Sequence, residues 1–312
     1  MNYEQCMNTG KWRIAMIITN ITGIGDPQIL LFEDTYYCYA TSHPAGFFVW
    51  SSKDLVNWSE PRLAFDASDH WGDACYWAPE VVYHNGKFVM HYSARWNQPD
   101  TLRLGVAVSD HPEGPFVDVH GGPMFDPGYS VIDGSVLRRP GKNYLYYSKD
   151  CSTNIVNGHH TSQVYVVELD ETLTKPVGEH KLMTTPEFSW ELLSAPEHPL
   201  WNEGPNVMEW NGKLIMNYSA NHYASNEYAI CIAQSDYPEG PWVKHDCANP
   251  VLSCRQELFG AGHNAFFYDK DGVLRTAFHV QTDPENPGGD RRVCIGTVVF
   301  EEKDGVVYQE IV

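Results

Sequence analysis

The segment that decides the fold runs from residue 77 to residue 93 and reads WAPEVVYHNGKFVMHYS. It holds two apolar stretches separated by Asn85-Gly86, a dipeptide that readily adopts the positive φ angles of a two-residue turn. Apolar stretches on both sides of such a turn predict a β-hairpin. Neither stretch alternates strictly between apolar and polar residues, which is typical of strands that pack on both faces.

The same pattern occurs five times along the chain, and such a repeat has to be identified before any fold is assigned. Each copy begins with a short apolar strand, makes a tight turn and continues into a second strand rich in aromatic residues. The copies cover residues 26–42, 77–93, 132–148, 203–219 and 262–280. Their turns are Glu33-Asp34, Asn85-Gly86, Gly141-Lys142, Asn211-Gly212 and Asp271-Gly272.

A second motif follows the hairpins: residues 109–116 read SDHPEGPF, residues 235–242 read SDYPEGPW, and residues 52–58 are a looser copy. Each copy comes after a further strand-like stretch, so each repeat holds about four strands. Five such units predict an all-β, five-bladed β-propeller in which each blade is a four-stranded antiparallel sheet. Residues 1–312 then form a single propeller domain. A pair of β-sandwiches is the alternative, but it does not require a fivefold repeat.

In a propeller the innermost strand of each blade lines the central axis, so the beginnings of all five inner strands meet at one mouth. Counting back about eight or nine residues from each hairpin turn finds the equivalent position in every repeat. These positions hold Asp26, Trp77, Asp133, Glu203 and His263. Three acids around one funnel raise one another's tendency to hold a proton, which suits a pair with one acid and one base. The sequence therefore predicts a catalytic site at this mouth.

Structural roles for the same residues are the alternative. Asp26 and Asp133 suit turns or caps, Glu203 suits a solvated rim, and His263 suits a hydrogen-bonded core position. Three acids in one structural register favour the catalytic interpretation of the carboxylates, whereas both interpretations of His263 stay open.

Aromatic residues gather near these positions, namely Trp71, Tyr76, Trp77 and Trp201. Sugars present flat C–H faces that pack on aromatic rings, so a rim of such residues beside acids predicts a glycan site. We expect substrate contacts from Trp71, Trp77 and Trp201. The chain has 10 Trp and 18 Tyr, and most of them must serve the core.

Three of these motifs, Gly25-Asp26-Pro27, Ile132-Asp133 and Glu203-Gly204-Pro205, resemble those of glycoside hydrolase family 43. Its members are five-bladed β-propellers that act on arabinose- and xylose-containing polysaccharides, and the resemblance covers residues 25–305. It implies that Asp26 is the general base and Glu203 the general acid. Asp133 would then orient the acid and tune its pKa.

Two later segments extend the resemblance. Gly262-His263-Asn264 resembles the segment whose histidine faces the axis, where many members bind calcium through water. It implies that His263 contacts a structural calcium ion through water, and that catalysis requires no cofactor. Residues 291–295 resemble a late strand that places an arginine near the sugar, for which Arg292 is the candidate.

The resemblance implies an inverting glycoside hydrolase. We expect an exo-acting α-L-arabinofuranosidase or β-xylosidase that acts on arabinose- and xylose-containing oligosaccharides. Three alternatives stay open: an endo- or exo-arabinanase of the same fold, a non-catalytic glycan-binding propeller, and a phosphorolytic relative whose phosphate pocket would use Arg291 and Arg292.

Charge, apolar runs and cysteine spacing indicate which partners and which cellular location to expect. The chain has 21 basic and 40 acidic residues and a formal net charge of −19, which disfavours nucleic acid and anionic membrane surfaces and suits a neutral oligosaccharide. No apolar run approaches the roughly 18 residues of a membrane helix or, near the N-terminus, the roughly 7 of a signal-peptide core. The eight cysteines show no C-x-x-C spacing, so free thiols are expected. Free thiols and the lack of an export signal predict a cytoplasmic location, although a secreted chain whose leader has been removed would show the same features. The oligomeric state is left open.

Overall fold

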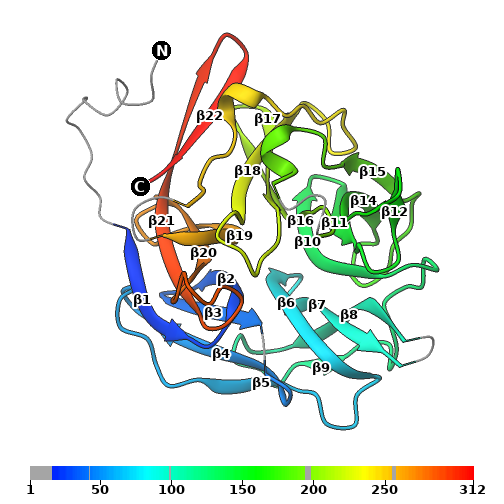
Figure 1. Cartoon of the computed structure of the whole chain (residues 1–312). Coiled ribbons are helices and arrows are strands. Elements are labelled where there is room, and N and C mark those ends of the chain that lie inside the picture. The colour runs from blue at the N-terminus through cyan, green and yellow to red at the C-terminus, as the bar shows by residue number, and fades with distance from the viewer. Residues whose placement is uncertain (1–15, 42, 98–99, 194–197, 255–257) are drawn as a thin grey trace.

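A computed structural model describes residues 16–312 except residues 42, 98–99, 194–197 and 255–257. Five antiparallel sheets surround a central channel and form a five-bladed β-propeller, as predicted (Figure 1). Blade I contains β2 (Gly25–Phe32), β3 (Thr35–Thr41), β4 (Gly46–Ser52) and β5 (Arg62–Asp66). Blade II contains β6 (Gly72–His84), β7 (Lys87–Trp96), β8 (Thr101–Ser109) and β9 (Val117–Asp118). Blade III contains β10 (Val131–Arg139), β11 (Lys142–Lys149), β14 (Gln163–Leu169) and β15 (Lys181–Thr184), with a small hairpin of β12 (Ile155–Val156) and β13 (His159–His160) inserted after β11.

Blades IV and V complete the ring. Blade IV contains β16 (Asn202–Trp210), β17 (Lys213–Ala220) and β18 (Ala229–Ser235), and blade V contains β19 (Phe259–Tyr268), β20 (Leu274–Gln281), β21 (Arg291–Lys303) and β1 (Ile17–Thr22). Two 3₁₀ turns, Ser189–Glu191 and Asp246–Ala248, are the helical elements of the described residues. One detail differs from the prediction: within those residues, blade IV has three named strands. In place of a fourth strand, Val243 makes an isolated bridge to Gln234 in β18.

The N-terminal strand closes the ring. Ile17 and Ile18 of β1 pair with Ile295 and Cys294 of β21, so the last blade takes its outer strand from the start of the chain. The C-terminal strand β22 (Val306–Ile311) pairs with the far half of β21, and this hairpin projects beyond the ring in Figure 1. The described part of the chain contains no helix long and apolar enough to span a membrane. Its seven cysteines are free thiols, as predicted, and Cys6 lies outside the described residues.

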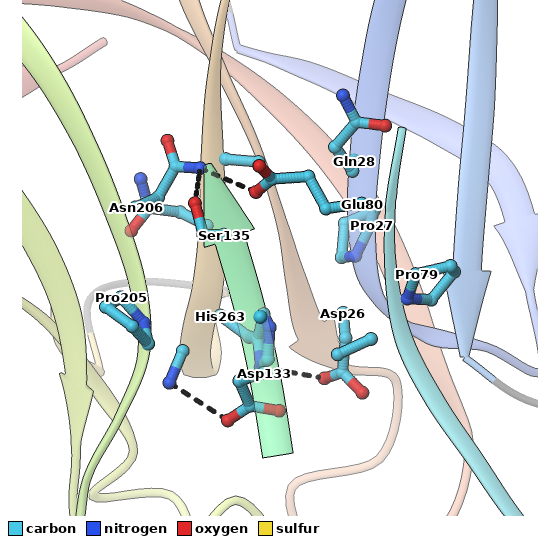
Figure 2. Close-up of a pocket in the computed structure, with 15 residues that line it drawn as sticks. Asp26, Pro27, Gln28, Pro79, Glu80, Asp133, Ser135, Pro205, Asn206 and His263 are labelled. Carbon is cyan, nitrogen blue, oxygen red and sulfur yellow. Dashed lines mark hydrogen bonds and ion pairs between the residues drawn. The ribbon is translucent and has the colours of Figure 1, made fainter. Parts of the chain in front are cut away.

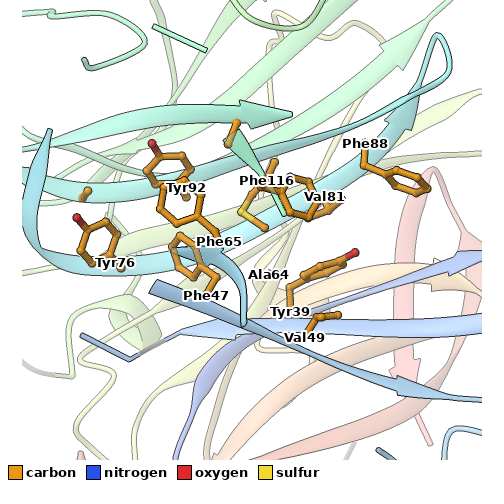
Figure 3. Close-up of a cluster of buried hydrophobic side chains, with 13 residues drawn as sticks. Tyr39, Phe47, Val49, Ala64, Phe65, Tyr76, Val81, Phe88, Tyr92 and Phe116 are labelled. Atoms are coloured by element: carbon orange, nitrogen blue, oxygen red, sulfur yellow. The ribbon is translucent and has the colours of Figure 1, made fainter. Parts of the chain in front are cut away.

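Apolar and aromatic side chains fill the spaces between neighbouring blades. Between blades I and II, Phe47 and Phe65 pack against Tyr76 and Tyr92 with ring centroids 5.0–6.3 Å apart (Figure 3). Such tilted and edge-on contacts are the arrangements that aromatic quadrupoles favour. Because each blade buries both of its faces in this way, the inner strands are held in fixed positions around the channel.

Each inner strand carries the same β-bulge near its start. In blade I, the pairing runs from Gly25↔Thr41 to Gln28↔Tyr39, so Asp26 and Pro27 lie opposite the single residue Ala40. A bulge of this kind needs positive φ at its first residue, a conformation that non-glycine residues seldom adopt. The five first residues are Asp26 (φ 52°), Ala78 (44°), Asp133 (60°), Gly204 (55°) and His263 (49°).

The bulges also correct the equivalence derived from counting back from the turns. That count placed Trp77 and Glu203 at the position of Asp26, but the structure places each of them one residue before the bulge. Since successive residues of a strand point to opposite sides, Glu203 reaches the mouth of the channel from a different direction than Asp26 and Asp133.

A ring of hydrogen bonds fastens the bulges to one another. The backbone N–H of each bulge's first residue donates to a side chain on the second strand of the preceding blade. The acceptors, with their donors and distances, are Thr41 Oγ1 (Ala78, 2.6 Å), Ser93 Oγ (Asp133, 3.1 Å), Ser148 Oγ (Gly204, 3.2 Å), Ser219 Oγ (His263, 2.8 Å) and His279 Nδ1 (Asp26, 3.1 Å). We call these five contacts the latches. They give a structural reason for the Ser or Thr at or near the end of the second strand in four of the five repeats.

Candidate active site

A cavity of about 530 Å³ opens at the bulged end of the channel, within the volume range of small-molecule sites. All three predicted catalytic carboxylates line it: Asp26 from β2, Asp133 from β10 and Glu203 from β16. These residues are 107 and 70 positions apart in sequence (133 − 26 and 203 − 133), so the circular arrangement of the blades is what brings them together. Figure 2 shows the carboxylates of Asp26 and Asp133 beside His263 at this end.

Asp26 is surrounded by positively charged and nitrogen-bearing side chains from blade V. Its Oδ1 accepts a hydrogen bond from Arg291 Nη1 at 3.1 Å, and His263 Nδ1 lies 3.4 Å from the same oxygen. Gly25 makes this possible, because a Cβ at that position would overlap the guanidinium of Arg291. Burial alone would raise the pKa of Asp26, but the charges of His263 and Arg291 outweigh it and hold that pKa well below its ordinary value. Asp26 is therefore ionised at neutral pH and suited to accept a proton.

Asp133 occupies the next acidic position around the cavity. Its Oδ2 accepts hydrogen bonds from the Gly204 N–H at 3.0 Å and from Ser148 Oγ at 3.2 Å. Burial raises the pKa of Asp133 to about 6, and the negative charge of Asp26 adds to this effect. The contact with Gly204 ties Asp133 to the residue directly after Glu203, so the two acids have fixed relative positions.

Glu203 is buried among other acids. Its Oε1 accepts a hydrogen bond from the Tyr228 hydroxyl at 2.9 Å. Burial raises the pKa of Glu203 well above its ordinary value, and the negative charge of Asp133 raises it further. Asp150, which also lines the cavity, contributes in the same direction. Glu203 therefore retains a proton that it can donate.

The predicted tryptophans separate into two groups. Trp77 and Trp201 line the cavity, and Trp201 stacks on His222 with ring centroids 4.7 Å apart. Trp71 lies elsewhere: it packs against the core between blades I and II, and its Nε1 donates to Asp118 Oδ2 at 3.1 Å. The prediction of a substrate contact for Trp71 is corrected accordingly, because this ring is held by the core between the blades.

The arginine that lines the cavity is Arg291, the neighbour of the predicted Arg292. Arg291 lines the cavity and binds Asp26, whereas Arg292 is not among the residues that line the cavity. Neighbouring residues of a strand point to opposite sides, so only one of the pair can face the substrate. The sequence motif places the strand but not which of its sides faces the cavity.

Several residues at or beside the cavity were not predicted from the sequence: Asp150, His222, Tyr223, Tyr228 and His279. Asp150 follows the second strand of blade III, and Tyr223 and Tyr228 lie in the connection between β17 and β18. Their positions carry no repeat signal, since connections differ from blade to blade. His279 did carry one, because it stands where the other four repeats have Ser or Thr.

A second, smaller cavity lies along the axis next to the carboxylates. Its volume is about 20 Å³, enough for roughly one water molecule, and Glu80, His263 and Asn264 line it. Asn264 Oδ1 is buried and has no hydrogen-bond partner among the described residues, so one water molecule would satisfy it. Calcium needs 6–8 oxygen ligands, and no group of three or more His, Cys, Asp or Glu residues within the described ranges is arranged to hold a metal ion. The calcium ion thus stays a prediction, and no catalytic step below depends on it.

Comparison with known proteins agrees with this geometry. The sequence pattern of "Glycosyl hydrolases family 43" matches residues 21–307. A curated β-D-galactofuranosidase from Aspergillus niger is 26% identical over 296 residues, which cover 89% of this chain and 79% of that protein.

Solved structures agree more closely. The crystal structure of a thermostable family-43 glycoside hydrolase has 43% identity and a TM-score of 0.86, with 94% of each chain covered. An endo-1,4-β-xylanase from Bacteroides thetaiotaomicron has 32% identity and a TM-score of 0.79, covering 92% of this chain and 94% of its own. The protein, with its three carboxylates gathered at one end of a five-bladed propeller, belongs to glycoside hydrolase family 43.

Proposed function

We propose that the protein hydrolyses glycosidic bonds of arabinose- or xylose-containing oligosaccharides with inversion of configuration, releasing sugars from the chain end. The observation that carries this proposal is the opposite electrostatic setting of two carboxyl groups in one cavity: the pKa of Asp26 is held low and that of Glu203 is held high. Such a split is what a base and an acid that act in the same step require.

In the proposed step, Asp26 removes a proton from a water molecule while that water attacks the anomeric carbon. Glu203 donates its proton to the departing oxygen, so the leaving group departs neutral. An inverting mechanism needs about 6.5–9.5 Å between the two carboxyl groups to admit the water. Asp133 keeps Glu203 protonated through its negative charge and orients it through Gly204.

Action on the chain end is supported by a relative described as an exo-α-(1→5)-L-arabinofuranosidase. Trp201, His222 and Tyr223 line one part of the cavity, and the guanidinium of Arg291 lies 5.2 Å from the centre of the Tyr223 ring. The sugar class is supported by relatives described as exo-α-(1→5)-L-arabinofuranosidase and β-xylosidase. A solved relative described as an endo-1,4-β-xylanase makes internal cleavage of xylan a second candidate.

Two measurements test the proposal. Release of nitrophenol from α-L-arabinofuranoside and β-D-xyloside should identify the preferred sugar, and product analysis on short xylo- and arabino-oligosaccharides should yield monosaccharides. Proton NMR during the first minutes of hydrolysis should show the product anomer opposite to the substrate. Accumulation of the same anomer would exclude inversion, and a ladder of oligosaccharides in place of monosaccharides would favour the endo-acting enzyme.

A further inference from the structure

One of the five latches differs from the rest in its chemistry. Four of them use a hydroxyl oxygen of Ser or Thr, whereas the latch on Asp26 uses the imidazole Nδ1 of His279. Nδ1 stands one bond further from Cβ than a Ser or Thr hydroxyl does, so this latch has a longer reach than the other four. It is also the latch that fastens the proposed general base.

The contact fixes the tautomer of His279. A ring nitrogen that accepts the N–H of Asp26 cannot itself carry a proton, so the proton of the neutral ring must be on Nε2. The Nε2 atom is buried and makes no hydrogen bond among the described residues, and burial lowers the pKa of His279 to about 4. His279 is therefore a neutral ring at ordinary pH.

This tautomer matters for Asp26. Nδ1 lies 3.4 Å from Asp26 Oδ1 but has no proton to donate to it. In this tautomer the imidazole accepts from the backbone of Asp26 and does not donate to its carboxylate, which keeps its lone pairs for Arg291 and for water. A hydroxyl at this place could rotate and donate to the carboxylate, which would weaken it as a base.

The same ring supports the acid. His279 stacks on Tyr228 with ring centroids 5.6 Å apart and an interplanar angle of 14°, and the Tyr228 hydroxyl donates to Glu203 Oε1. Gly262, which pairs with His279 across the hairpin, leaves room for this stack, because a Cβ there would overlap the Tyr228 ring. One imidazole therefore contacts both the Asp26 backbone and Tyr228, the hydrogen-bond partner of Glu203.

We infer that His279 is a positioning residue for the hydrolysis: through Nδ1 it sets the place of the Asp26 backbone, and through its ring it sets the plane of Tyr228. The inference rests on the proposed function, in which Asp26 is the base and Glu203 the acid. A misplacement of about 1 Å in a catalytic group can lower a rate by about 10²-fold, so a positioning role has a measurable cost.

Three variants separate the contributions of the nitrogen and the ring. His279→Phe keeps an aromatic ring against Tyr228 but removes the acceptor, and it should lower kcat about 100-fold with KM within about twofold. His279→Asn places an amide oxygen at the reach of Nδ1 and should recover kcat to within about fivefold of the unmodified protein, while His279→Ser should not. A kcat for His279→Phe within twofold of the original, or no recovery with His279→Asn, would overturn the inference.

Controls distinguish this inference from the proposed function and from simple loss of stability. Ile295→Val removes a buried methyl group from the core of the same blade and should lower the melting temperature without changing kcat. If Asp26→Asn leaves activity intact, the proposed function fails. If Asp26→Asn abolishes activity and His279→Phe does not lower it, only the positioning role fails.

A spectroscopic measurement tests the latch without any assay. The ¹⁵N chemical shifts of His279, assigned by their loss in His279→Asn, should report an unprotonated Nδ1 and a protonated Nε2 at pH 7. Protonation of Nδ1 would mean that the ring donates to the Asp26 carboxylate, which contradicts the inference.

Discussion

The two sides of the cavity offer opposite environments to chemically similar groups. On the side of blades I and V, Asp26 faces Arg291 and His263, and its pKa is held low. On the side of blades III and IV, Glu203 faces Asp133 and Asp150, and its pKa is held high. Both carboxyl groups are largely buried, so burial cannot explain the difference between them. The neighbouring charges supplied by different blades decide which carboxyl is the base and which is the acid.

The largest expected effect comes from neutralising the side that accepts the proton. Asp26→Asn keeps the size of the side chain and its place in the bulge but removes the base. We expect kcat to fall by about 10⁴-fold, the upper end of what general base catalysis contributes. The measurement is steady-state hydrolysis of the preferred nitrophenyl glycoside, with circular dichroism to confirm that the variant folds. A loss smaller than tenfold would mean that the base lies elsewhere.

The next effect concerns the side that donates the proton. Glu203→Gln removes that proton, so hydrolysis of an unactivated alkyl glycoside or oligosaccharide should fall by about 10³-fold. A nitrophenyl glycoside should lose about tenfold or less, because its leaving group departs without protonation. Comparing the two substrates with one variant provides the control. Equal losses on both would contradict the role of Glu203 as the acid.

Asp133→Asn tests whether the charge on the acidic side maintains the contrast. The negative charge of Asp133 raises the pKa of Glu203, so its removal lowers that pKa. Glu203 must be protonated to act, and the alkaline limb of the pH profile of kcat should therefore move to lower pH by about one unit. Activity near pH 8 should suffer more than activity near pH 5. An unmoved alkaline limb would show that the charge of Asp133 does not contribute to the pKa of Glu203.

Arg291→Met tests the opposite side and should have the smallest effect. The guanidinium lowers the pKa of Asp26, so its removal raises that pKa. Asp26 must be ionised to act, and the acidic limb of the profile should move to higher pH by about one unit. Arg292→Met is the matched control and should leave this limb in place. A shift with Arg292→Met and none with Arg291→Met would reverse the assignment of the two arginines.

The fold and the carboxylates were predictable from the sequence because both are carried by the repeat. The turn of each hairpin is recognisable in the sequence, and Asp26, Asp133 and Glu203 lie eight or nine residues before the turns of their repeats. Trp77 and Trp201 were found in the same way, since they adjoin the bulges and the strand starts.

Two details of the site differ from the prediction, the position of Trp71 and the arginine that lines the cavity, because the repeat gives no information on them. Which of Arg291 and Arg292 faces the cavity depends on strand orientation, which a motif does not specify. Trp71 precedes the inner strand of blade II by one residue, and only packing between blades decides that its ring turns into the core. Asp150 and Tyr228 reach the site from connections that differ in length and sequence from blade to blade.

The closure of the ring by β1 also fixes Arg291, the partner of Asp26. Arg291 begins β21, and Gly23, which follows β1, donates its N–H to the Arg291 carbonyl oxygen at 3.1 Å. The partner of Asp26 thus arrives with the last blade synthesised, and it is fixed by a strand made first. A chain in which only the first four blades have formed holds all three carboxylates but lacks Arg291, one of the groups that lower the pKa of Asp26. The contrast between the two carboxyl groups is therefore complete only when β1 has paired with blade V.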